Sequence, residues 1–109
     1  MAKSKSYKDD LLASLKEPRE AVEYLNAALH DGDPEVFLLA LRDVTEALGG
    51  MNSLSKKTKL NRVNLYRMLS KRGNPQLQSL CVLLEALGFK LSVAVKGRRQ
   101  RKGTAMIAS

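Results

Sequence analysis

The sequence predicts an all-α domain of about five helices followed by a short C-terminal β-strand. Apolar residues recur at three- and four-residue spacing up to about residue 88, which is the period of an α-helix. Proline, aspartate and glycine interrupt this pattern where helices would begin and end. From residue 89 to 95 apolar and small or polar residues alternate, as is typical of a half-buried strand.

The length of 109 residues suffices for one domain with a single modest core. We expect residues 1–33 to form an N-terminal extension with the first helix, and residues 34–88 to form a helix-turn-helix domain. Residues 89–95 are a candidate dimerisation strand, and residues 96–109 are expected to form a basic, flexible tail.

Two helices are predicted before residue 50. The first opens at Pro18 and stops at Asp31–Gly32, and the second has Asp33–Pro34 as its cap and first turn and ends before Gly49–Gly50. The apolar stripe of the first consists of Ala21, Val22, Leu25, Ala28 and Leu29. That of the second consists of Phe37, Ala40, Leu41, Val44 and Leu48.

Residues 51–70 predict two short helices joined by a tight turn, the pattern of a helix-turn-helix. The two helices of such a unit pack closely near their crossing, so the unit needs apolar side chains at a few fixed positions and a small residue where the backbones meet. Ser55 is the small residue. The apolar positions are Leu54, Leu60, Leu65 and Met68.

The second helix of this unit would begin after Asn61, whose side chain can cap the first free amides. With Leu65, Met68 and Leu69 inward, the opposite side carries Arg62, Val63, Tyr66 and Arg67, with Asn64 near its edge. Arginine and asparagine match the guanine and adenine edges of the DNA major groove. An ordinary helical hairpin with a solvated polar face is the alternative.

A break at residues 71–74 precedes another helix, which Pro75 opens and Gly88 closes. Its predicted inward positions are Leu77, Leu80, Cys81, Leu84 and Leu87. Free backbone amides at its start, around Gln76 and Leu77, are expected to meet a phosphate. The complete set of expected DNA-binding residues is Asn61, Arg62, Val63, Asn64, Tyr66, Arg67, Lys71, Arg72, Asn74 and Gln76.

The strand predicted at Leu91, Val93 and Val95 has no second strand to pair with in this chain. Its expected partner is the same strand of a second subunit, which would make the protein a homodimer. The alternative is an extended segment that lies on its own domain. The basic cluster of the tail would contact phosphates or remain solvated, and it consists of Lys96, Arg98, Arg99, Arg101 and Lys102.

Charge is distributed unevenly between the two halves of the chain. Six basic and ten acidic residues give residues 1–50 a charge of −4, whereas thirteen basic residues and Glu85 give residues 51–109 a charge of +12. Such a basic half attracts nucleic acid, an anionic membrane or an acidic protein. No long apolar run or basic amphipathic helix favours a membrane, so double-stranded DNA is the expected partner. Since the first ten residues also lack the pattern of a secretory signal, we expect a cytoplasmic protein.

The sequence does not indicate an enzyme. Its single histidine, His30, falls at a helix end, and its single cysteine, Cys81, falls on an apolar stripe where we expect it to pack in the core. We therefore expect no catalytic residue, no metal ligand set and no cofactor.

Residues from about 10 to 95 also resemble a known family. The run LYRMLSKRGNPQLQSLCVLLEALGFKLSV resembles the lambda-repressor-like Cro/C1 domain. The runs EPREAVEYLNAAL and GDPEVFLLALRDVTEALGGMNSLSKKTKLNRVNLYRMLS resemble the HigA-like addiction-module antidote proteins, which are type II antitoxins. The resemblance implies a dimer that binds operator DNA, represses its own operon and neutralises a RelE-like ribonuclease toxin.

Two positions depart from the family pattern. The family usually has glycine where this chain has Lys59, and usually an acidic residue where it has Val63. Lys59 is expected to accept a strained backbone or to change the turn slightly. Val63 removes a negative charge near the DNA and offers a surface for a thymine methyl group, so the operator sequence should differ from those of relatives.

Two other functions remain open at this stage. One is a toxin-binding inhibitor with weak or lost DNA binding, and the other is a stand-alone phage-type repressor. The inhibitor is suggested by acidic residues that could face a basic toxin but could equally form a solvated helix face, namely Asp9, Asp10, Glu17, Glu20 and Glu23.

Overall fold

The structure is a computed structural model that describes residues 2–96, with side chains from residue 7 onward. The regular secondary structure of this part of the chain is entirely helical, and it contains no β-strand. Its six helices are α1 (Ala2–Leu15), α2 (Pro18–Asp31), α3 (Pro34–Ala47), α4 (Gly50–Thr58), α5 (Arg62–Met68) and α6 (Leu77–Ala86). No helix among these residues is long and apolar enough to cross a membrane.

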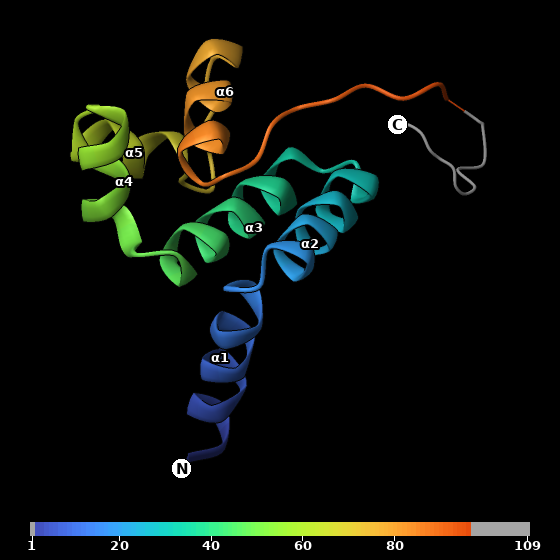
Figure 1. The fold of residues 1–109 in the computed structure, drawn as a ribbon, viewed down its shortest axis with the longest axis vertical. Helices are drawn as coiled ribbons and strands as arrows, with labels where there is room; N and C mark the ends of the chain where they lie inside the picture. Colours follow the sequence, from blue (N-terminus) through green and yellow to red (C-terminus); the bar gives the residue numbers. More distant parts are fainter. Residues whose placement is uncertain (1, 97–109) are drawn as a thin grey trace.

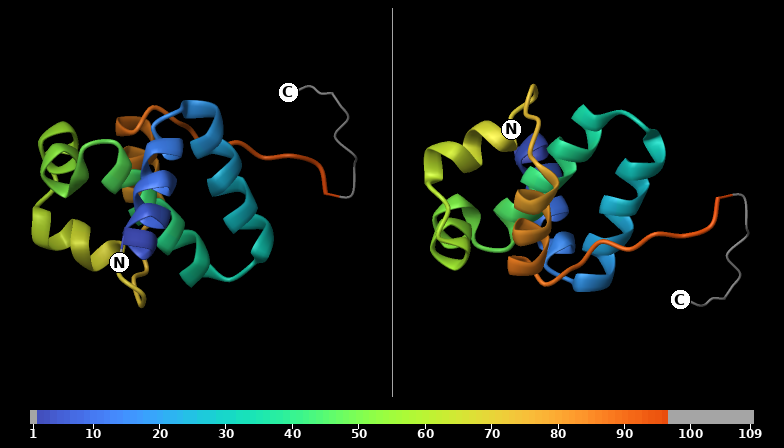
Figure 2. Two further views of the ribbon diagram at one scale, coloured as in Figure 1. Left: turned by 90° about the horizontal axis from the view of Figure 1, so that it is seen from below. Right: turned by 90° about the horizontal axis from the view of Figure 1, so that it is seen from above.

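Helix α3 is the centre of the molecule, because it packs against α1, α2 and α4. Helix α4 in turn packs against α5 and α6. The pair α4–α5 therefore lies at one end of α3, while α1 and α2 lie along its other side (Figure 1). The views in Figure 2 agree with this arrangement.

The predicted ends of α2 and α3 are confirmed. Gly32 ends α2 with φ 84°, and its amide donates to the Leu29 carbonyl. Asp33 caps α3, since its side chain accepts a 2.9 Å hydrogen bond from the amide of Glu35. Proline follows the cap at position 34 and fixes the first turn.

One contiguous core joins all six helices. Its buried apolar residues are Leu15, Ala21, Leu25, Ala28, Phe37, Leu38, Ala40, Leu41, Val44, Ala47, Leu54, Leu65, Leu69, Leu83 and Leu84. Most of the stripe positions predicted for α2 and α3 belong to this core. Val22 and Leu29 of α2 are exposed instead.

Helix α1 raises the number of helices from the expected five to six. It was missed because residues 2–10 are mainly polar, so no apolar stripe develops until Leu11, Leu12 and Leu15. Leu15 is fully buried, whereas Leu11 and Leu12 are partly buried against the core. Lys8 also forms ion pairs with Asp43 (3.9 Å) and Glu46 (3.6 Å) of α3. Tertiary packing rather than local pattern therefore holds α1.

The predicted inward face of α6 was partly wrong. Cys81 is exposed rather than buried, and Leu77 is 69% exposed. The fully buried positions are Leu83, which was not predicted, and Leu84. Because α6 carries apolar side chains on most of its circumference, spacing alone does not identify the face that packs on α4. The helix also begins at Leu77 with Gln76 as its N-cap, two residues after Pro75.

Residues 89–95 do not form the predicted strand within the described chain. A strand needs hydrogen bonds from a neighbour, and a single copy offers none at this edge. The start of the segment contacts its own domain, because Phe89 packs against the core and Leu91 lines a hollow there, but its end does not, since Val93 is 99% exposed and Val95 is 71% exposed. It leaves the body on the side away from α4–α5 (Figures 1 and 2). The predicted basic cluster at positions 98–102 falls outside the described residues.

Candidate functional site

The turn between α4 and α5 is held by side-chain hydrogen bonds to its backbone. Ser55 Oγ donates to the Leu60 carbonyl at 2.6 Å. Thr58 Oγ1 donates to the Leu54 carbonyl at 2.8 Å and accepts from the amide of Leu60 at 3.1 Å. The small residue predicted at position 55 thus also ties the end of the turn to α4.

Lys59 adopts the left-handed backbone conformation that its place in the turn requires. Its φ is 64°, which makes it the one residue other than glycine with positive φ in the described chain. Its amide donates to the Ser55 carbonyl at 2.7 Å and so closes the C-terminus of α4. The structure therefore shows the first of the two outcomes expected for Lys59, a left-handed backbone at a residue that carries a Cβ.

Asn61 caps α5 as predicted. Its Oδ1 accepts hydrogen bonds from the amides of Val63 (2.7 Å) and Asn64 (3.4 Å). Leu65 and Leu69 are completely buried, and Met68 is partly buried. The Asn61 cap and the burial of these side chains together fix which side of the seven-residue helix α5 faces solvent.

The opposite side of α5 faces solvent, as predicted. Its exposed side chains are Arg62, Val63, Asn64, Tyr66 and Arg67. This group is called the outer face of α5 below. It combines hydrogen-bond donors, one amide and two apolar side chains within a length of about two turns, which matches the chemistry of a base-pair edge.

Sequence reasoning missed Asn52 as a member of this site. The side chain of Arg62 donates a hydrogen bond from Nη1 to Asn52 Oδ1, and this bond links α5 to α4 across the turn. The two residues are ten positions apart, and no local periodicity relates them. Only the packing of the two helices brings them together.

The loop after α5 places four of the predicted residues at the surface beside the same unit. Lys71, Arg72, Asn74 and Gln76 are all exposed. The loop is tight because the amide of Gly73 donates to the Ser70 carbonyl at 2.9 Å, and a Cβ at position 73 would overlap the Met68 carbonyl. The side chain of Gln76 makes no cap hydrogen bond, so it leaves the first amides of α6 available to an external acceptor.

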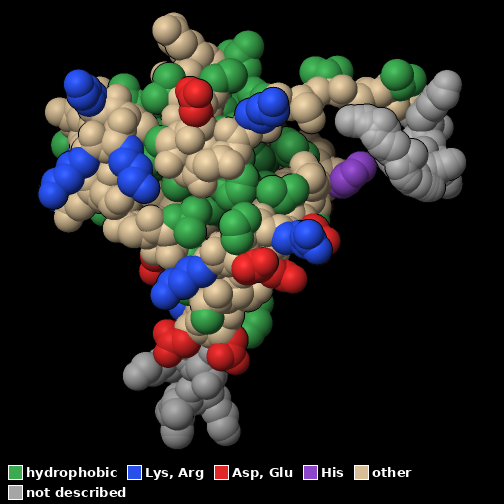
Figure 3. All heavy atoms as spheres, in the orientation of Figure 1, with side chains coloured by type: hydrophobic (Ala, Val, Ile, Leu, Met, Phe, Trp, Pro, Cys, Tyr) green, Lys and Arg blue, Asp and Glu red, His purple; other side chains and the backbone are tan. Residues whose placement is uncertain are grey.

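Positive charge gathers around this unit. Residues 51–76, which span α4, α5 and the loop that follows, contain seven basic residues and no acidic residue. In Figure 3 a group of Lys and Arg side chains lies over the end of the molecule that holds α4–α5, while others are scattered beside α1, α2 and α6; Asp and Glu side chains gather mainly over α1 and α2. The site is therefore a short polar helix face within a basic surface.

The acidic side of the molecule, formed by α1, α2 and α3, combines one partly buried hydrogen bond with exposed carboxylates. The Tyr24 hydroxyl donates to Asp43 Oδ2 at 2.6 Å, which joins α2 to α3. Burial, together with this carboxylate, raises the pKa of Tyr24 above its ordinary value near 10. The five acidic residues predicted as a toxin contact, Asp9, Asp10, Glu17, Glu20 and Glu23, are all exposed. Among the side chains that the structure describes, none forms an ion pair with them.

Comparison with known proteins identifies the family. The family model of probable addiction module antidote proteins matches residues 6–95, which include α2 to α6 and the whole candidate site. An uncharacterized protein of Haemophilus influenzae is 30% identical over 84 residues, which cover 77% of this chain and 86% of that protein. No solved structure gives a significant match. The chain therefore belongs to the family of probable addiction module antidote proteins, and membership implies a toxin partner.

Proposed function

We propose that this protein is the antitoxin of a type II toxin–antitoxin pair, and that it binds its operator through α4 and α5 and represses its own operon. The observation that carries the proposal is the outer face of α5. The Asn61 cap and two buried leucines fix this face, and it lies within residues 51–76, which contain seven basic residues and no acidic residue. The hydrogen bond from Arg62 to Asn52 also supports the proposal, because it orients the guanidinium on this face.

In this mechanism α5 enters the major groove as the second helix of a helix-turn-helix. Arg62, Asn64 and Arg67 contact base edges or adjacent phosphates, and Val63 meets a thymine methyl group. Asn52 orients the Arg62 guanidinium, which reduces the conformational freedom lost on binding. Sequence discrimination then depends on the outer face of α5.

Affinity depends on a second group of contacts. Lys71 and Arg72 neutralise phosphates, and Asn74 donates to the same strand. The amides at the start of α6, after Gln76, donate hydrogen bonds to a phosphate oxygen at the positive end of the helix dipole. These contacts set the position of the protein on the duplex but do not read its sequence.

The proposal also includes a lambda-repressor-like Cro/C1 fold and the role of a HigA-like antitoxin. The chain order supports a lambda-repressor-like Cro/C1 arrangement, because the α4–α5 unit follows α2 and α3 and precedes α6. A HigA-like antitoxin of this kind would neutralise a RelE-like ribonuclease. The exposed acidic residues of α1 and α2 lie away from the basic site and offer a surface for such a basic toxin (Figure 3).

The test of DNA reading is a fluorescence-anisotropy titration against the protein's own promoter and a shuffled duplex of equal length, at two salt concentrations. We expect a preference for the promoter that persists at the higher salt. Arg67→Ala should reduce this preference by about 1 to 3 kcal/mol. Arg72→Ala should weaken binding to both duplexes alike. Equal losses on both duplexes for both variants would refute the division between reading and positioning.

A toxin-binding inhibitor with weak or lost DNA binding is the second candidate, and the unpaired acidic side chains favour it. Deleting residues 1–30 would remove Leu15, Ala21, Leu25 and Ala28 from the core, so charge neutralisation is the better test. The variant replaces the five acidic residues by their amides, and the probe is the product of the neighbouring reading frame. Reduced capture with unchanged promoter binding would support a separate toxin surface, whereas undiminished capture would place that contact elsewhere. A stand-alone phage-type repressor would bind the promoter and capture no toxin.

A further inference from the structure

The chain ends its described part in an exposed apolar segment. Residues 91–95, called the arm, carry Leu91, Val93 and Val95 on one face and Ser92 and Ala94 on the other. Val93 and Val95 make little contact with the part of the chain that the structure describes, since they are 99% and 71% exposed. The arm stands away from the body in both views of Figure 2. Leaving two β-branched apolar side chains in water is unfavourable unless another surface covers them.

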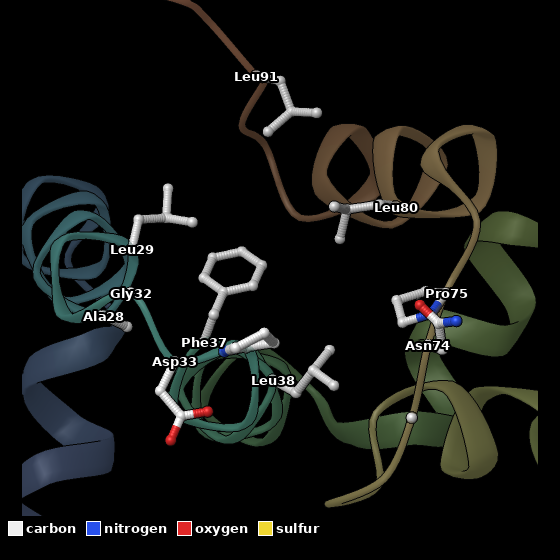
Figure 4. Close-up of a pocket in the computed structure, with 12 residues that line it drawn as sticks. Ala28, Leu29, Gly32, Asp33, Phe37, Leu38, Asn74, Pro75, Leu80 and Leu91 are labelled. Carbon is white, nitrogen blue, oxygen red and sulfur yellow. The ribbon is translucent and has the colours of Figure 1, made fainter. Parts of the chain in front are cut away.

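An apolar hollow lies at the base of the arm. Its volume is about 320 Å³, and it opens between the α2–α3 turn, the loop before α6 and α6 itself. Leu29, Phe37 and Leu80 project into it, and Leu91 stands at its mouth (Figure 4). Its lining is mainly hydrophobic, and Leu29 remains 51% exposed there. The hollow therefore has the chemistry to accept an aliphatic side chain.

The arm cannot fill this hollow with its own Val95. Four residues of extended chain separate Leu91 from Val95, a distance of about 13 Å. The intervening Ser92, Val93 and Ala94 include no glycine or proline that would reverse the chain. Val95 can therefore reach such a hollow only on a second copy of the chain.

We propose that two copies of this chain exchange arms, so that each inserts Val95 into the hollow of the other. Antiparallel pairing centred on Val93 places Leu91 directly opposite Val95 of the second copy, at the mouth of the hollow. The interface is self-complementary, as a two-fold dimer requires, and it satisfies backbone groups that a lone arm leaves unpaired. This arrangement goes beyond strand pairing, because it names the body residues that receive the partner.

The register has an electrostatic consequence. It brings Lys90 opposite Lys96 of the second copy at each end of the paired arms, on the face away from the hollow. Repulsion between these exposed lysines is screened by salt. The dimer should therefore dissociate more readily at low ionic strength.

The first test measures molar mass by light scattering during size-exclusion chromatography of the full chain without DNA. We expect the measured molar mass of the wild type to be twice its chain mass of 12.0 kDa. Val95→Asp should give monomers, whereas Ala94→Asp, which adds the same charge on the other face of the arm, should remain dimeric. Leu29→Asp should also give monomers, while Val22→Asp, on the same helix with 40% exposure and outside the hollow, should not. A monomeric wild type, or equal dissociation by Ala94→Asp and Val22→Asp, would overturn the proposal.

The second test fixes the register. In a Cys81→Ser background, Leu91→Cys combined with Val95→Cys should form a covalent dimer on oxidation, because opposite residues lie within disulfide reach. The pair is too far apart within one arm to close on itself. Leu91→Cys with Ala94→Cys places the thiols on opposite faces and should crosslink poorly. A dimer by mass that fails to crosslink at positions 91 and 95 would show a different interface. Neither test uses DNA, so loss of operator binding would leave this inference standing.

Discussion

Replacing Lys59 by glycine should stabilise the protein, because the structure places this lysine in a left-handed conformation with φ 64°. That conformation costs an L-residue with a Cβ about 1 to 2 kcal/mol. Glycine adopts it freely, but it loses about 0.5 to 1 kcal/mol more on folding because its unfolded chain is more flexible. The net gain expected for Lys59→Gly therefore lies between about 0 and 1.5 kcal/mol, with a midpoint of about 0.75 kcal/mol. For a chain of this size the midpoint corresponds to a rise in melting temperature of about 3 to 6 °C.

The assay is thermal and urea denaturation followed by circular dichroism at 222 nm, and the control is Lys59→Ala. Alanine removes the charge but keeps the Cβ, so it should leave the stability close to that of the wild type. This control matters because Lys56 and Lys57 precede the turn, and loss of a like charge could also stabilise it. If alanine and glycine raise the melting temperature equally, charge repulsion is the cause and the backbone argument is wrong.

Three further predictions concern the packing of the site and of the acidic side. Asn61→Ala should lose the α5 cap and about 1 kcal/mol of stability, whereas Asn61→Asp should retain both the cap and the stability. If both variants lose the same stability in urea denaturation, the cap contributes nothing. Gly73→Ala should destabilise the protein by about 1 to 3 kcal/mol and weaken DNA binding, because the added Cβ overlaps the Met68 carbonyl. The control is Gly32→Ala, whose added Cβ meets open space and which should leave DNA binding intact. Tyr24→Phe should be less stable than the wild type near neutral pH, because it loses the hydrogen bond to Asp43. The pKa of Tyr24 is raised in the folded state, so the stability that its hydroxyl contributes is present below pH 10 and decreases as the pH rises further. The difference in stability between wild type and Tyr24→Phe should therefore shrink between pH 9 and pH 11. A difference in urea midpoint that stays constant over this range would contradict the prediction.

Much of the candidate site could be predicted from the sequence because its determinants are local. Asn61 as a cap, Leu65 and Leu69 as buried anchors and the outward direction of Arg62 and Arg67 all follow from helical spacing within ten residues. The same holds for the cap at Asp33, where the side chain bonds an amide only two residues away. Interactions of this range act before any tertiary structure forms.

The tertiary structure decided the features that depend on distant neighbours. The hydrogen bond from Arg62 to Asn52 exists only because α5 packs on α4, and α1 is held by α2 and α3 rather than by its own pattern. The exposure of Cys81 depends on which side of an almost wholly apolar helix meets α4. The alternation at residues 91–95 specified an extended backbone, but a strand also needs a neighbouring chain to complete its hydrogen bonds. Sequence periodicity determines which faces are apolar, whereas packing determines which of them is covered.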